Sequence, residues 1–221
     1  MSLSSSLRSR WQTVVDWFFV PVDARVYACV RITYALTCLV ILLQLWPVRM
    51  TYLSEQGSLI PILTPQLSPL TWSRSELTVN LFMGSAIAAA LCLLFGVLAR
   101  LSALVLFVWH VAFATAAYMV MGGFDMVVRL VGFVVLLAPP AHVWTLKRAS
   151  APSEAVFAPA YALRLIQFQT CVMYWATVWL KAPDPYWRNG ELMAYFQMSV
   201  FARFPTLLGA EHPRLSVVAT W

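Results

Sequence analysis

The chain has 221 residues, of which 61% are hydrophobic and only 11% are charged, and its formal net charge is +6. A soluble domain has about 45–50% apolar and about 25% charged residues, so this composition excludes an ordinary soluble globular protein. The basic residues are scattered singly rather than gathered into a patch, which argues against a nucleic-acid partner. The composition instead predicts an integral membrane protein whose surroundings are the lipid bilayer.

The first twenty residues do not have the pattern of a cleavable signal peptide. Their apolar stretch contains Asp16, and no small-residue cleavage site follows it. Several apolar residues there can share one side of a helix: Trp11, Val14, Val15, Trp17 and Phe18. We therefore expect residues 1–20 to form a helical N-terminal segment in the membrane interface.

Five apolar stretches meet or approach the roughly 20 residues that a helix needs to cross the hydrocarbon core. They cover residues 25–46, 77–99, 101–120, 126–139 and 161–181. The fourth ends at Pro139-Pro140, because consecutive prolines remove backbone donors and clash with the preceding turn. The predicted fold is all-α, a polytopic transmembrane helix bundle of about five spans with interfacial helices and a partial sixth span.

Residues 1–221 are expected to form a single transmembrane domain, because no linker, repeat or low-complexity segment interrupts them. Residues 47–76 form a predicted extracytoplasmic loop that is apolar enough to pack on the helix ends. Residues 183–221 are expected to form an interfacial segment, amphipathic over 190–204, and an incomplete sixth span from 215 onward. The positive-inside rule favours a cytoplasmic N-terminus, on five basic residues: Arg8, Arg10, Arg100, Lys147 and Arg148.

Ionisable residues at membrane depth are costly, so each is expected to have a partner or a cavity. Arg31 lies about two turns into the first span, and we interpret it as an orienting arginine that reaches Asp23 or a lipid phosphate near the cytoplasmic surface. Asp125 and Arg129 have the i,i+4 spacing of counter-ions on one helix face. A ligand site beside them is the alternative, since Gly122-Gly123 would let a ligand approach the backbone.

His110 lies in the middle of the third span, where an interhelical hydrogen bond is the favoured role. A proton carrier or a pigment ligand is the alternative. The four cysteines lie inside apolar runs, and no histidine or carboxylate accompanies them at metal spacing. We therefore predict no metal site.

One face of the fifth span carries polar groups from end to end and is expected to face inward. It includes Arg164, Gln167, Tyr174 and Lys181. By spacing alone, Lys181 is best interpreted as a snorkelling lysine at the membrane boundary. A buried lysine can also act as a general base, and this role stays open.

Several segments around the fifth span resemble the central signature of the HTTM (horizontally transferred transmembrane) family, which is related to the membrane domain of the vitamin K-dependent gamma-carboxylase. They are residues 165–169, Tyr174, Lys181 and Trp187-Arg188-Asn189-Gly190. Asp23 with Arg31, and residues 52–57, are similar to the family's opening and first loop. The resemblance implies a bacterial inner-membrane protein, with Lys181 at the position of the carboxylase's catalytic base and a quinone as a possible cofactor.

Gamma-carboxylation itself is not expected, because the chain offers Asp125 where the carboxylase has an essential histidine. The first functional hypothesis is a non-catalytic accessory or scaffold subunit of a larger membrane complex, for example a respiratory or photosynthetic one. The alternative is a carboxylase-related enzyme acting on a quinone or lipid, with Lys181 as base and Tyr174, Gln167 and His110 lining the pocket. A transporter is less favoured, since no inverted repeat is visible.

Overall fold

A computed structural model of the chain describes residues 3–57, 69–117, 121–139, 143–146 and 157–198, which are mostly helical. It divides into two compact units, residues 1–166 and 167–221, and each is considered by itself below. The first unit contains α1 (Leu3–Phe19), β1 (Pro21–Asp23), α2 (Ala24–Leu45), α3 (Arg49–Leu53), the 3-10 helix η1 (Pro69–Thr71), α4 (Glu76–Leu94), α5 (Ala99–Ala116), α6 (Gly123–Leu137) and β2 (Phe157–Pro159). Helix α7 (Tyr161–Lys181) crosses the boundary, and α8 (Pro185–Arg188) and α9 (Glu191–Met198) follow.

Three helices in the described part of the chain are long and apolar enough to cross a membrane: α2 with 22 residues, α4 with 19 and α5 with 18. They coincide with the first three predicted spans, and they make the chain an integral membrane protein. Helices α6 and α7 form where the fourth and fifth spans were expected, with 15 and 21 residues, but neither is among these three. Their crossing of the membrane stays a prediction.

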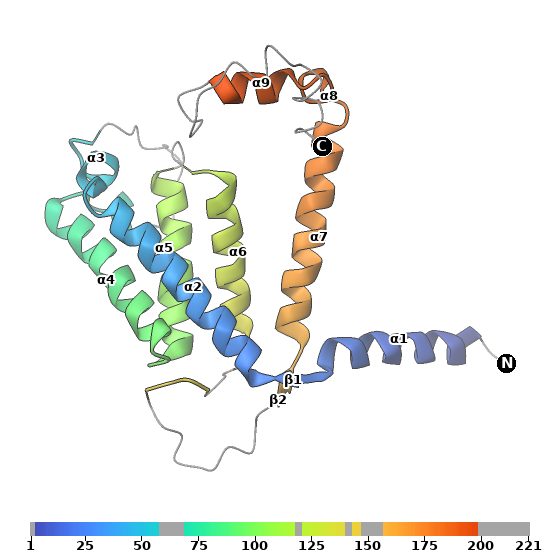
Figure 1. Ribbon diagram of the computed structural model, residues 1–221. Coiled ribbons are helices and arrows are strands. Elements are labelled where there is room, and N and C mark those ends of the chain that lie inside the picture. The colour runs from blue at the N-terminus through green and yellow to red at the C-terminus, as the bar shows by residue number, and fades with distance from the viewer. Residues whose placement is uncertain (1–2, 58–68, 118–120, 140–142, 147–156, 199–221) are drawn as a thin grey trace. The chain divides into compact units, whose positions relative to one another are not determined.

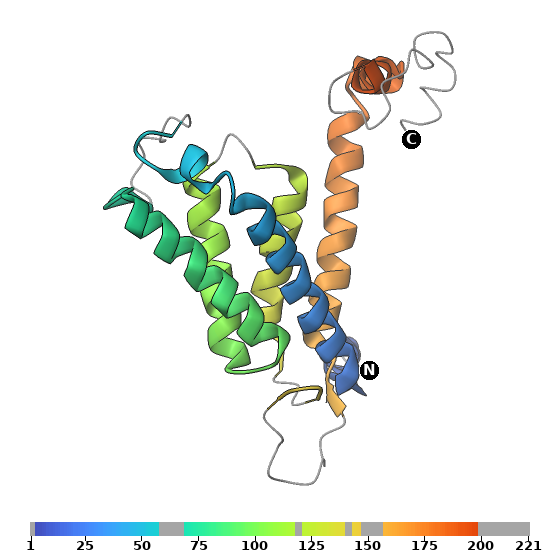
Figure 2. The ribbon, with the colours of Figure 1, turned by 60° about the vertical axis from the view of Figure 1, so that its left-hand side comes forward.

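The four helices α2, α4, α5 and α6 pack side by side as a bundle (Figures 1 and 2). Alanines fill many of the contact positions, which lets the helix backbones approach closely. Those with no more than a tenth of their surface exposed include Ala28, Ala35, Ala86, Ala89, Ala90, Ala103, Ala112 and Ala116. Because lipid tails are as apolar as leucine, close packing of this kind is what holds membrane helices together.

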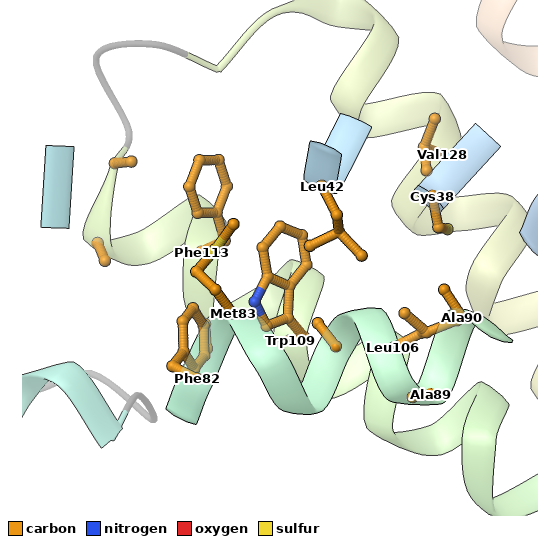
Figure 3. Close-up of a cluster of buried hydrophobic side chains, with 14 of the residues drawn as sticks. Cys38, Leu42, Phe82, Met83, Ala89, Ala90, Leu106, Trp109, Phe113 and Val128 are labelled. Atoms are coloured by element: carbon orange, nitrogen blue, oxygen red, sulfur yellow. The ribbon is translucent and has the colours of Figure 1, made fainter. Parts of the chain in front are cut away.

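Aromatic and aliphatic side chains form the bundle core (Figure 3). The Trp109 ring stacks on Phe82 at 5.7 Å and on Phe113 at 5.0 Å between centroids. Leu53 of α3 and Leu70 of η1 are fully buried in the same core. The described ends of the predicted 47–76 loop thus pack on the bundle, as its apolar composition indicated; residues 58–68 lie outside the described residues.

A two-stranded ribbon closes the end of the bundle where α2 begins. β1 and β2 are antiparallel, with Pro21 opposite Pro159 and Asp23 opposite Phe157. The Tyr27 hydroxyl donates to the Pro159 carbonyl at 2.6 Å, and the Tyr161 hydroxyl donates to the Leu137 carbonyl. These bonds tie the first turn of α7 to the start of α2 and the end of α6.

The segments expected at the membrane interface are helical where they are described. Helix α1 covers most of residues 1–20, and its Trp11 and Trp17 are exposed. Helix α9 lies within the predicted amphipathic segment 190–204. The interfacial position of both stays a prediction, and the expected incomplete sixth span lies outside the described residues.

Candidate functional site

A cavity of about 490 Å³ lies at the end of the bundle where α2 and α5 begin and α4 and α6 end. Most of its wall is apolar, with side chains such as Val30, Leu93, Leu101 and Val135. Ligand sites in proteins are typically of this size and are lined mainly by apolar groups with a few polar ones. This cavity is therefore the candidate ligand site of the first unit.

The connection between α4 and α5 forms one side of the cavity and has the geometry of a Schellman motif. Gly96 donates its N–H to the Leu93 carbonyl at 3.1 Å, and Val97 donates to the Cys92 carbonyl at 2.8 Å. Gly96 takes the left-handed φ of +69° that this cap requires and that glycine adopts without strain. Leu98 also has a positive φ, 47°, which is uncommon for a residue with a branched side chain. The turn thereby brings α5 back within four residues of α4.

Arg31 anchors the segment after α6 over this turn. Its Nη2 donates to the carbonyls of Trp144 at 2.8 Å and Val143 at 3.3 Å, and the residue is only 6% exposed. Leu146 N–H donates to the Phe95 carbonyl at 3.0 Å, so the same segment is also bound to the end of α4. The orienting role predicted for Arg31 thus involves backbone carbonyls. The predicted partner Asp23 instead caps α2, accepting the Arg25 N–H at 2.8 Å.

The cavity wall is electropositive. Among its described residues there are two arginines, Arg31 and Arg100, and no carboxylate. The first turn of α5 contributes Ala99, Arg100 and Leu101, and no side chain caps it. Since Ser102 is the first residue whose N–H reaches a carbonyl of this turn, at 2.9 Å from Leu98, the preceding N–H groups add the positive end of the helix dipole.

Three buried polar groups lie deeper in the bundle. Tyr34, Trp109 and His110 are each 3% exposed, and the Tyr34 hydroxyl, Trp109 Nε1 and His110 Nε2 have no hydrogen-bond partner among the described residues. His110 Nδ1 lies 3.0 Å from the Leu106 carbonyl one turn earlier in its own helix. Among the described residues, His110 thus makes a hydrogen bond within α5 and not the predicted bond to another helix. A histidine in the middle of a helix can make such a bond to the preceding turn of its own helix.

Asp125 and Arg129 lie on α6, which packs against α5, the helix of His110. The Asp125 carboxylate accepts the Gly122 N–H at 2.8 Å and so caps the start of α6. Within the described residues it does not form the predicted ion pair with Arg129, because capping turns the carboxylate back toward the helix end. The structure thus brings three separately predicted residues into one region, although Asp125 has a structural role there.

The polar residues predicted on the fifth span have different surroundings from one another. The Arg164 guanidinium lies 4.3 Å from the centre of the Trp17 ring, a cation–π contact between α7 and α1 within the first unit. Gln167 and Tyr174 belong to the second unit and are exposed. The contact with Trp17 gives Arg164 a structural role in packing α7 against α1.

Lys181 ends α7 and has an aromatic partner in its own unit. Its Nζ lies 3.8 Å from the centre of the Trp187 ring, which is the contact an ammonium ion makes with an aromatic face. Asp184, which follows it, accepts the Tyr186 N–H at 2.9 Å and caps α8. This arrangement gives Lys181 and Asp184 structural roles at the end of α7.

Replacing Lys181 distinguishes these structural roles from catalysis. Lys181→Arg keeps a cation over Trp187 and is expected to leave the thermal stability unchanged, whereas Lys181→Met removes the contact at a cost of about 0.5–1 kcal/mol. Arginine stays protonated in proteins and does not act as a general base. Thermal unfolding in detergent and complementation of a deletion strain measure the two properties. Loss of biological activity in Lys181→Arg with unchanged stability would identify Lys181 as a base.

Sequence reasoning missed much of the cavity. Arg31 was noticed, but Gly96, Arg100 and Thr145 were not connected with it. The Phe95-Gly96 step after an apolar run was an available signal of a helix C-cap.

Comparisons with protein-family models, curated proteins and solved structures found no match.

Proposed function

We propose that the protein is a non-catalytic accessory or scaffold subunit of a larger membrane complex, built on a scaffold that resembles the HTTM family. The observation that carries this proposal is the character of α7. It has 21 residues, enough to cross a membrane, but it is not among the helices apolar enough to do so in lipid alone. Arg164, Gln167 and Tyr174 recur along it at helical spacing.

A membrane-length helix with such residues is stable when its polar face meets other helices, because polar side chains exposed to hydrocarbon are costly. Helices α2, α4 and α5 differ in this respect, since each is long and apolar enough to cross lipid. A partner helix from another subunit would cover the exposed side of α7, where Tyr174 is 67% exposed. We further propose an inner-membrane location with the N-terminus in the cytoplasm, on the positive-inside bias.

Site-specific photocrosslinking in native membranes tests this proposal. A benzophenone amino acid at position 174 is expected to give one adduct with a second membrane protein that also co-purifies in fixed stoichiometry. The matched control is position 81 on α4, where Leu81 is 65% exposed and lipid contact is expected. Adducts confined to the chain itself would show that α7 is covered within the molecule, and would overturn the proposal.

The second candidate is the carboxylase-related enzyme that acts on a quinone or lipid. The first unit has a cavity large enough for such a ligand, although Lys181 is not among the described residues that line it. The comparison of Lys181→Arg with Lys181→Met decides this candidate independently of the crosslinks.

A further inference from the structure

We propose that the cavity at the end of the bundle binds an amphiphile with an anionic headgroup, with the head beside Arg31, Arg100 and the first turn of α5 and the hydrocarbon tail along the apolar wall. This inference is independent of the subunit proposal.

The cavity has the size and lining of a ligand site. At about 490 Å³ it is far larger than the space a single water occupies. Val30, Leu101 and Val135 are apolar lining residues that suit a hydrocarbon chain. The Arg31 bonds to the loop carbonyls hold its guanidinium at the wall, so the polar end of the cavity is preorganised.

The charge of the wall selects an anion. Arg31, Arg100 and the N-terminus of an 18-residue helix line it, and no carboxylate lies among the described lining residues. Phosphate and carboxylate oxygens accept hydrogen bonds both from arginine and from the N–H groups of a helix N-terminus.

The position of the cavity selects a ligand that also has a tail. Its lining comes from the first two turns of α2, the first turn of α5 and the last turn of α4, which are the ends of the three membrane spans. Arg31 lies seven residues after the first residue of α2, roughly 10 Å along the helix axis. A headgroup at this depth keeps its tail in the hydrocarbon layer, whereas a soluble anion would have to leave water.

Native mass spectrometry of the delipidated full chain in mild detergent tests the proposal with defined probes. Phosphatidylglycerol and oleate are expected to remain bound, about tenfold more tightly than phosphatidylcholine. Retention of only one of the two anionic probes would still support the amphiphile site and would identify its headgroup chemistry. Equal binding of phosphatidylcholine or of a menaquinone analogue would contradict selection for an anionic headgroup. If inorganic phosphate bound as tightly as phosphatidylglycerol, the site would be one for soluble anions, and the proposed amphiphile site would be overturned.

Paired arginine variants locate the headgroup. Arg100→Gln is expected to weaken phosphatidylglycerol binding about tenfold, because charge-assisted hydrogen bonds are lost. Arg25→Gln removes an exposed arginine at the same end of α2 that does not line the cavity, and is expected to stay within about twofold of the parent chain. If both variants lost phosphatidylglycerol affinity equally, the effect would come from the general surface charge, and the proposed headgroup site would be wrong.

A tail-wall variant provides a second, uncharged test. Val135→Trp fills the apolar side of the cavity and is expected to weaken binding of both anionic probes while leaving circular dichroism unchanged. Undiminished binding in this variant would place the amphiphile elsewhere on the protein.

Discussion

Gly132→Ala is expected to lower the free energy of unfolding by about 1–3 kcal/mol, although alanine is the better helix former by about 1 kcal/mol. Gly132 is buried on α6, and a Cβ there would overlap the Tyr34 hydroxyl of α2 and lie 2.9 Å from Tyr34 Cζ. The two helices must therefore separate or the tyrosine must leave its rotamer. Unfolding in sodium dodecyl sulfate, followed by circular dichroism, measures the difference.

Two further variants separate this steric effect from a general effect of glycine replacement. Gly84→Ala on α4 is the matched control, because no atom lies within 4 Å of a Cβ at that position, and it is expected to be neutral or stabilising. Tyr34→Phe removes a buried hydroxyl that has no hydrogen-bond partner among the described residues, so it is expected to cost little by itself. Combined with Gly132→Ala it should recover part of the loss; strictly additive effects would argue against the contact.

Long uninterrupted apolar runs made the three membrane-length helices predictable from sequence. The expected spans 25–46, 77–99 and 101–120 correspond to Ala24–Leu45, Glu76–Leu94 and Ala99–Ala116. Their C-terminal ends were the least accurate, because Phe95 and Ala117 are as apolar as the helices they follow and only backbone geometry ends those helices. The sequence predicted the end of α6 more accurately, because Pro139 forces Ala138 into an extended backbone conformation.

Individual polar residues were easier to identify from sequence than their partners. Spacing along one helix predicted an Asp125–Arg129 pair, but spacing carries no information about the Gly122 N–H that competes for the carboxylate. Lys181 was noticed, yet its partner Trp187 lies beyond a helix break. The cavity depends on four helix ends and on a loop whose position is set by Arg31, so no single stretch of sequence encodes it.

The largest effect at the cavity is expected from Gly96→Ala, which combines backbone strain with a steric conflict. Alanine at a φ of +69° costs about 1–2 kcal/mol, and overpacking typically adds about 1–3 kcal/mol. Its Cβ would overlap Thr145 Cγ2 and lie 3.1 Å from Arg31 Nη1. We expect a marked fall in thermal stability together with weaker binding of phosphatidylglycerol, since the conflict displaces both the loop and the guanidinium that line the cavity.

A second substitution divides this effect into its two causes. Thr145→Ser removes the methyl group that the new Cβ would overlap and keeps the hydroxyl and the Cβ, which lies 2.9 Å away. Gly96→Ala with Thr145→Ser should therefore regain part of the steric cost and retain the backbone strain. Gly123→Ala, at the first residue of α6 with no atom within 4 Å of a Cβ, is the control for replacing a glycine near a helix end. If Thr145→Ser restores nothing, the loop does not pack against the α4–α5 turn as Arg31 and Leu146 indicate. If it restores lipid binding as well as stability, the turn, the loop and the charged wall act together as one preorganised site.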